Sequence, residues 1–276
     1  MLPVIFYRES QTPEEEQIAI KKYFASTTTR TQLPKGTTHL VGRYSVLPYY
    51  QETYNDIRLA HHISLINTPE HHRFAADVGN WATTFEGFTP RTWDRLEDIP
   101  EQGPFVLKGE TNSRKDHWRT HMFAKDKKEA IQVALRLGED SLISSQKLYI
   151  REYVPLQSYG TSLGGAPIAH EFRLFFLYGI FVIGGFYWSN YTDQLTIPTP
   201  TINEVPSHIF LKISERLKDN INFCAVDVAK TQSGEWIVIE VNDGQMSGLS
   251  EINADEFYSE LQVHLIAHIT KTHSNG

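Results

Sequence analysis

The sequence predicts an α+β protein built of three lobes. Strand and helix patterns alternate over the first 70 residues, which is typical of a small α/β unit. Between residues 83 and 103, Gly, Pro and Thr are frequent, which favours a connector between lobes. From Glu171 onward the pattern is mostly β and ends in one helix, so we expect an antiparallel sheet there.

The first lobe is predicted to span residues 1–88 as the α/β unit. Its opening strand is apolar, and the three acidic residues that follow Pro13 are favourable at a helix N-terminus. Two more strands follow, with a second helix between them. The expected elements are a strand at 3–7, a helix from residue 13, a strand at 38–41, a helix at 48–60 and a strand at 62–66.

The second lobe, residues 89–154, is predicted to be small. An apolar strand runs into a polar stretch, and a helix with one apolar face follows before the next strand. The expected elements are a strand at 105–108, a polar loop at 109–116, a helix at 126–137 and a strand at 148–154.

The third lobe, residues 155–276, is predicted to contain the antiparallel sheet. Its strands are short apolar runs, and the second and third of them are separated by a helical pattern. The expected strands lie at 172–178, 181–188, 223–229 and 236–241, and the expected helices at 207–220 and 254–269.

Composition and charge exclude several classes of protein. Lysine and arginine number 26 against 33 acidic residues, a net charge of -7 without a basic cluster, so general nucleic-acid binding is not expected. The longest apolar run, 174–191, contains three glycines and favours a β-hairpin over a membrane helix. The apolar stretch at 2–7 is too short for a signal peptide, so we expect a cytoplasmic location. Cys224, the only cysteine, is expected to pack in the core.

A polar trio follows the two strands predicted at 223–229 and 236–241. If Asp227 lies opposite Glu240 across a four-residue loop at 232–235, Asn242 points to the same face, because strand side chains alternate. Ile239 and Val241 would then face the other way. Carboxylate and amide oxygens suit Mg²⁺ or Mn²⁺.

The alternative for the trio is structural. Asp227 would be a surface residue, and Glu240 and Asn242 would end the hairpin before a turn. The apolar neighbours of Asp227 and Glu240 favour the cation, because an unpaired buried carboxylate is costly.

With its glycine turn at Gly234, this pattern resembles the C-terminal signature of the ATP-grasp superfamily, in which an Asp, a Gly turn and Glu-x-Asn follow one another. The resemblance implies an ATP-grasp fold with an N-terminal α/β lobe, a small lid lobe and a C-terminal antiparallel β lobe. It also implies that Asp227, Glu240 and Asn242 bind two divalent ions, Mg²⁺ or Mn²⁺, that bridge the phosphates of ATP.

Upstream segments match the same family in order. Lys108 ends the run FVLK and resembles the lysine that contacts ATP phosphates; we expect its side chain to be exposed in the empty cleft. IREYV at 150–154 resembles the hinge beside the adenine edge, which implies roles for Glu152 and Tyr153. Taken alone, Lys108 is an ordinary surface residue at a strand end.

EFRLFF at 171–176 resembles a further element of the family. The resemblance implies that Glu171 meets the ribose and Arg173 the phosphates, and alternation places both on one face. The alternative is an exposed cross-strand ion pair, worth about 0–1 kcal/mol. Ser189 and Asn190 resemble a polar pair near the phosphates and the metal.

Two features depart from the family pattern. The loop GETNSRKDHW at 109–118 has one glycine, where a glycine-rich loop usually covers the phosphates, so Ser113, Arg114 and Lys115 are the alternative donors. The second nucleotide lysine is also missing. Arg73 is the nearest cation before Pro90, which suggests a clade in which arginine replaces that lysine.

The resemblance implies an ATP-dependent carboxylate-amine ligase. Lys108 and Arg173 are the expected catalytic cations, acting on an acyl phosphate that an amine then attacks, with release of ADP and phosphate. The expected partners are a carboxylate substrate and an amine acceptor, which is an amino acid, a peptide or a protein, and no membrane. The alternatives are a phosphotransferase on the same scaffold and a nucleotide-binding module without turnover.

Overall fold

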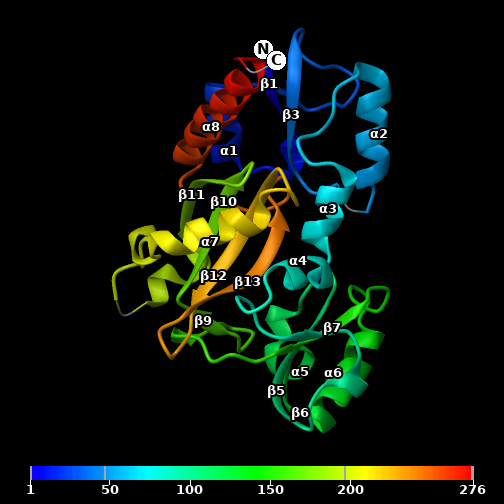
Figure 1. Ribbon diagram of the computed structural model, residues 1–276, viewed down its shortest axis with the longest axis vertical. Helices are drawn as coiled ribbons and strands as arrows, with labels where there is room; N and C mark the ends of the chain where they lie inside the picture. The colour runs from blue at the N-terminus through cyan, green and yellow to red at the C-terminus, as the bar shows by residue number, and fades with distance from the viewer. Residues whose placement is uncertain (1, 47, 196, 275–276) are drawn as a thin grey trace.

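The computed structural model describes residues 2–46, 48–195 and 197–274. Figure 1 shows the N-terminal lobe at one end, the main antiparallel sheet in the middle and the small lobe at the other end. The predicted α+β class is confirmed, and each lobe is organised around its own sheet.

The N-terminal lobe has a parallel sheet in the order β2-β1-β3, flanked by helices α1 and α2. The acidic residues predicted to favour the start of α1 lie in its first turn, and two lysines lie in its last turn, as the helix dipole favours. These elements are β1 (Leu2–Tyr7), α1 (Glu14–Tyr23), β2 (Ala25–Thr27), β3 (Thr37–Arg43) and α2 (Tyr50–His61).

The strand predicted at 62–66 is wrong. His62 adopts a left-handed conformation with φ 57° and ends α2, so the chain turns instead of extending. Only Leu65 then pairs with β3, through a single bridge to Leu40. Two short helices follow that the sequence did not predict, α3 (Pro69–Ala76) and α4 (Val78–Thr84).

Side chains cap both of these short helices. Thr68 and His71 form a reciprocal capping box with Pro69 in the first turn of α3. The Asp77 carboxylate accepts a hydrogen bond from the Gly79 N–H and caps α4. At eight and seven residues the helices are too short for a clear apolar period.

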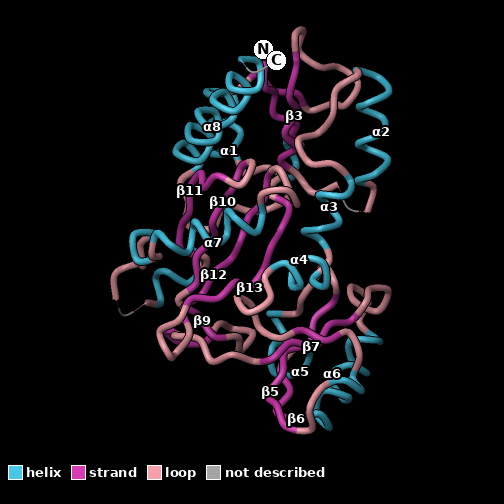
Figure 2. Tube along the Cα trace, viewed as in Figure 1, coloured by secondary structure: helices cyan, strands magenta, loops and turns pink. Residues whose placement is uncertain are grey.

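The small lobe contains an antiparallel sheet in the order β4-β7-β5-β6, with α6 packed on it (Figure 2). The predicted strands and helix of this lobe are present, whereas β4 and β6 were not predicted. The elements are β4 (Thr92–Trp93), β5 (Gln102–Gly109), α5 (Trp118–His121), β6 (Phe123–Asp126), α6 (Lys127–Glu139) and β7 (Leu148–Glu152).

The main sheet is antiparallel in the order β11-β10-β12-β13, as predicted. Its first hairpin turns at Tyr178 and Gly179, both with positive φ, which confirms the hairpin predicted in this apolar run. No helix among the described residues is long and apolar enough to cross a membrane. The elements are β8 (Ser158–Thr161), β9 (Pro167–Ala169), β10 (Glu171–Leu177), β11 (Ile180–Phe186), α7 (Ser207–Leu217), β12 (Phe223–Lys230), β13 (Trp236–Asp243) and α8 (Ala254–Ser274).

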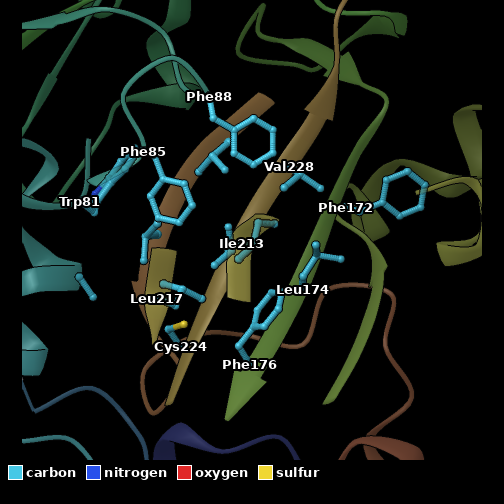
Figure 3. Close-up of a cluster of buried hydrophobic side chains, with 14 of the residues drawn as sticks. Trp81, Phe85, Phe88, Phe172, Leu174, Phe176, Ile213, Leu217, Cys224 and Val228 are labelled. Atoms are coloured by element: carbon cyan, nitrogen blue, oxygen red, sulfur yellow. The ribbon is translucent and has the colours of Figure 1, made fainter. Parts of the chain in front are cut away.

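Both faces of the main sheet are covered by apolar cores. On one face, α7 and the aromatic residues that follow α4 pack against alternate residues of β10 and β12; Cys224 lies in this core, as predicted (Figure 3). On the other face, α8 and α1 cover one half of the sheet in a core shared with the N-terminal lobe. The charged side chains of the candidate site lie on the second face, on the half toward the small lobe.

Candidate active site

The strand pair β12-β13 places the predicted polar trio on one face. Asp227 pairs directly with Glu240, as predicted, and Ala225 pairs with Asn242. The connecting loop is one residue shorter than predicted, because Lys230 pairs with Trp236 and the Thr231 N–H donates to the Glu235 carbonyl at 2.8 Å.

A β-bulge at Ile239 takes up the difference in register. It also turns the Ile239 side chain toward the same cavity as Glu240, so the prediction that these two residues face opposite sides is wrong. The bulge therefore adds an apolar wall beside the carboxylate of Glu240.

Arg173 on β10 holds Asp227 through two parallel hydrogen bonds. The guanidinium Nε and Nη2 lie 2.9 and 2.8 Å from the two carboxylate oxygens, and Asp227 is fully buried. Burial lowers the pKa of Arg173, but the Asp227 carboxylate outweighs that effect and raises the pKa above its usual range. The ion pair is therefore buried, and the exposed pair considered from the sequence is wrong.

Lys108 at the end of β5 reaches across to the main sheet and donates to the Glu240 carboxylate. The lysine is 5% exposed, so the expectation of an exposed side chain is wrong. Burial lowers the pKa of Lys108, and the charge of Glu240 opposes that shift. Burial raises the pKa of Glu240, but the charges of Lys108 and Lys115 outweigh it and hold the pKa well below its usual range.

The loop after β5 brings a second lysine to the same group. The Lys115 ammonium donates to the Tyr187 hydroxyl at 2.9 Å and lies 4.4 Å from the centre of that ring. Burial lowers the pKa of Lys115, but the nearby Tyr187, Glu171 and Glu240 raise it above the usual range. Arg114, the other cation of the loop, instead pairs with Asp140.

The hairpin β8-β9 fixes this loop in place. The Trp118 N–H donates to the Gly164 carbonyl at 3.2 Å. A side chain at Gly164 would begin 2.5 Å from the Lys115 carbonyl oxygen, so only glycine lets the two backbones approach so closely. The glycine that permits close approach is thus on the covering hairpin.

Glu171 is sealed beneath the charged group. The Trp188 indole N–H donates to its Oε2 at 2.9 Å, whereas Oε1 is the one fully buried side-chain polar atom without a hydrogen-bond partner among the described residues. Burial raises the pKa of Glu171 to about 7, against the opposing charge of Lys115. This carboxyl is poised between its two protonation states at neutral pH.

Two cavities meet at the pair of Lys108 and Glu240, which lines both of them. The first, of about 110 Å³, lies between the lobes and has Val106, Ile237 and Ile239 among its walls. The second, of about 240 Å³, is polar and contains Asn242 together with Thr111 and Asn112 of the loop.

The matching family model describes an ATP-grasp domain, family 3 of one clade of that superfamily, and covers residues 55–261. The chain belongs to this ATP-grasp family. The membership confirms the resemblance predicted from the sequence and the general class, an ATP-dependent ligase. The sequence matches no curated protein.

Solved structures with a similar fold come from ATP-grasp enzymes of low sequence identity. D-cycloserine synthetase DcsG is 14% identical over 95% of this chain and 99% of its own, with a TM-score of 0.60. The ATP-grasp ligase PsnB, in complex with a minimal precursor, is 11% identical over 96% and 98%, with a TM-score of 0.59. D-alanyl-alanine synthetase A from Vibrio cholerae is 11% identical over 99% and 98%, with a TM-score of 0.56.

Arg151 on β7 is a buried cation of the ATP-grasp cleft that sequence reasoning left without a role. Its guanidinium donates to the Ile239 carbonyl at 2.6 Å and to the Thr89 hydroxyl at 2.7 Å, and lies over the Trp81 ring. Burial lowers the pKa of Arg151 to about 10, against the opposing charge of Glu240. An arginine within the apolar run IREYV is the signal that could have identified it.

Some of the predicted nucleotide residues do not converge on the ATP-grasp cleft. Arg73 is exposed on α3 and pairs with Glu70 on the same helix, so the structure does not bring it to the cavities. Asn190 is likewise exposed. Glu152 and Tyr153 line the apolar cavity, although the Tyr153 N–H already donates to the Pro104 carbonyl at 3.0 Å.

The donor set fits a divalent ion that keeps other ligands of its own. Glu240 and Asn242 open to the polar cavity, whereas both oxygens of Asp227 accept hydrogen bonds from Arg173. Across the described ranges, no three His, Cys, Asp or Glu residues gather as a complete metal site. One carboxylate and one amide oxygen suit Mg²⁺, which is commonly completed by water and phosphate oxygens.

Proposed function

We propose that this protein joins a carboxylate to an amine at the expense of ATP, through an acyl phosphate. The observation that carries the proposal is the position of the Lys108–Glu240 pair, at which the apolar and the polar cavity meet. A nucleotide in the first cavity would extend its phosphates toward the cations at this junction. The reacting carboxylate would then lie in the second cavity.

The apolar cavity suits the adenine base. Ile237 and Ile239 of the main sheet face Val106 of the small lobe, which allows a flat ring to lie between them. Glu152 and Tyr153, at the end of β7, lie where the polar edge of the base would be recognised. Glu171 and Asn190 remain the proposed ribose and phosphate contacts from the family resemblance.

Four buried or half-buried cations surround the proposed phosphate path: Lys108, Lys115, Arg151 and Arg173. We assign the role of the missing nucleotide lysine to Arg151, because Arg151 lines the cleft and Arg73 does not. Divalent ions, of which the family resemblance implies two, would be held by Glu240, Asn242 and Asp227 and would neutralise phosphate charge.

The chemistry requires that charge be offset, because a carboxylate and a triphosphate repel one another. Lys108 and Arg173 would offset the charge on the transferred phosphoryl group while the substrate carboxylate attacks it. The loop held by Gly164 and the hairpin β8-β9 would limit access of water to the acyl phosphate. An amine then displaces phosphate and forms the amide.

Hydroxylamine trapping tests the proposal directly. The protein is incubated with Mg²⁺, ATP, hydroxylamine and a panel of amino acids and short peptides, because structural neighbours include an amino-acid synthetase and a ligase bound to a precursor peptide. We expect a hydroxamate to form in step with ADP. Lys108→Gln should reduce it by roughly 10²–10³-fold. Lys147→Gln, a lysine of the same lobe outside both cavities, is the matched control and should retain it.

Other outcomes of the same assay separate the alternatives. A stable phosphorylated product with ADP and no hydroxamate would support a phosphotransferase. Binding of ATP without ADP formation for any acid would support a nucleotide-binding module. Either outcome would overturn the ligase proposal.

A further inference from the structure

His72 on α3 lies in a buried network at the end of β13. Its Nδ1 lies 3.1 Å from one oxygen of Asp243, and its ring stacks on Tyr50 with the ring centres 4.2 Å apart. The residue is 6% exposed. Capping and packing of α3 against β13 therefore place an imidazole beside the strand that carries Glu240 and Asn242.

The Asp243 carboxylate is fixed so that one oxygen serves His72. The other oxygen accepts hydrogen bonds from the Asn67 amide at 2.8 Å and from the Gln245 N–H at 2.9 Å. The Gln245 side chain also donates to the Tyr50 hydroxyl at 2.7 Å. Both residues that contact the imidazole are thus held in place by further hydrogen bonds.

The second ring nitrogen of His72 opens to the polar cavity. No described residue hydrogen-bonds Nε2, and the one sealed side-chain polar atom without a partner is Glu171 Oε1. His72 lines the cavity that also contains Lys108, Glu240 and Asn242. Nε2 therefore faces the space in which the amine would attack under the proposed function.

The hydrogen bond to Asp243 sets which nitrogen carries the proton. A carboxylate accepts, so Nδ1 must donate, and in the neutral ring Nε2 is then the acceptor. An imidazole oriented by a buried carboxylate is the arrangement that serves as a proton acceptor in hydrolytic triads. The charged groups that face His72 from neighbouring elements are Asp243, Glu240, Glu110 and Lys108.

We propose that His72 is the base that accepts the proton of the attacking amine, and that Asp243 is its positioning residue. This inference rests on the proposed ligase function. The nitrogen lone pair forms a bond to the carbonyl carbon of the acyl phosphate. The bond from that carbon to the phosphate oxygen breaks, and phosphate leaves with the electron pair. The proton of the amine passes to Nε2, and the imidazolium later releases it to water.

The amine can approach from the N-terminal lobe. A third cavity, of about 650 Å³, shares Ser45 with the cavity that His72 lines. It lies past the carboxyl ends of β1 and β3, where ligands of parallel sheets commonly bind. The acceptor class is therefore the amine of a molecule larger than ammonia.

The first test examines the protein without substrate. Nitrogen-15 NMR of histidine-labelled full-length protein, with His72 identified by loss of its signals in His72→Gln, reports which ring nitrogen carries the proton. We expect a neutral ring with the proton on Nδ1, and a change in these signals in Asp243→Asn. A proton on Nε2 of neutral His72 would overturn the proposal, and because this readout uses the wild type, it does not depend on the variant's folding.

The second test separates the two chemical steps. Hydroxylamine is largely unprotonated at neutral pH and needs little help from a base, whereas an ordinary amine does. With an acid that gives hydroxamate, and with each of the amino acids as acceptor, His72→Gln should retain hydroxamate formation and lose amide formation by roughly 10²–10⁴-fold. His71→Gln is the matched control, because glutamine preserves the capping box and His71 lies outside the cavity.

The outcomes distinguish this inference from the proposed function. Equal amide formation in His72→Gln and wild type would overturn the role of His72 while the ligase proposal stands. Equal loss of hydroxamate and amide would place His72 in the first step and also overturn it. If wild type forms no hydroxamate with any acid, the proposed function fails, and the inference that rests on it falls with it.

Discussion

Removing the charge of Lys108 tests whether its ion pair with Glu240 is as buried as the structure shows. In Lys108→Gln, Glu240 keeps its burial and loses its hydrogen-bonded cation. Removing one partner of a buried ion pair typically costs about 3–5 kcal/mol. Lys115 and Arg173 also favour the ionised Glu240, so we expect the low end of that range, about 3 kcal/mol.

Double substitution sharpens the test. Lys108→Gln combined with Glu240→Gln leaves no unpaired charge, so it should cost less than the sum of the two single changes. We expect a coupling free energy of about 2–3 kcal/mol from the four proteins. Urea unfolding followed by tryptophan fluorescence and by far-UV circular dichroism measures it, provided that the two transitions coincide.

A matched control comes from an ion pair on the same lobe. Lys147 lies 2.8 Å from Asp94, and both side chains are about half exposed, so Lys147→Gln should leave unfolding almost unchanged. Wild-type stability in Lys108→Gln, or strictly additive effects in the double variant, would refute the reasoning from burial.

Three further predictions concern the same charged group. Arg173→Lys keeps the charge but loses the two-pronged contact with Asp227, so it should lower both the midpoint of thermal unfolding and turnover; an unchanged midpoint and rate would count against the buried pair. Because the pKa of Glu171 is raised to about 7, the folded state keeps a proton that the unfolded state loses, and stability falls as pH rises from about 4.5 toward 7. Glu171→Gln removes that loss, so its stability relative to wild type should increase between pH 5 and pH 8 in thermal unfolding; a constant difference would contradict the raised pKa. Glu240→Gln should reduce the thermal stabilisation by ATP that depends on Mg²⁺, whereas Glu235→Gln, in the turn outside the site, should keep it; equal stabilisation in both would count against the metal role.

The sequence could predict the pairing of Asp227 with Glu240 because apolar runs and strand alternation restrict the register. It could not predict the bulge at Ile239. A four-residue loop without a bulge and a three-residue loop with one place the same two carboxylates opposite each other. The difference affects only which way Ile239 points, and nothing in the local pattern encodes that.

Burial of Lys108 depends on a partner 132 residues away in the chain. A lysine at a strand end is usually exposed, and only the closeness of β5 to β13 in the folded protein reverses this. Arg151 is different, because a cation within an apolar strand already indicates a buried partner. The reasoning that favoured a cation beside Asp227 applies equally to Arg151 and would have replaced Arg73.

The network of His72 was beyond sequence reasoning for another reason. Two adjacent histidines in a short helix look alike in the sequence, yet His71 caps α3 and His72 stacks beneath the sheet. Their roles differ because successive helical residues point about 100° apart, and only one of these directions meets Asp243. Helix α3 had to be recognised first.

The charged groups of the site hold one another in place before nucleotide binds. Lys108 pairs with Glu240 and Arg173 with Asp227, so neither buried carboxylate is left without a cation. A magnesium nucleotide offers each member a new partner, because phosphates attract the cations and the metal attracts the carboxylates. Binding then exchanges existing ion pairs for others and exposes no bare charge to the apolar surroundings. For the same reason, a single neutral substitution at either pair should affect stability and ATP binding together, and the double substitution should restore stability without restoring binding.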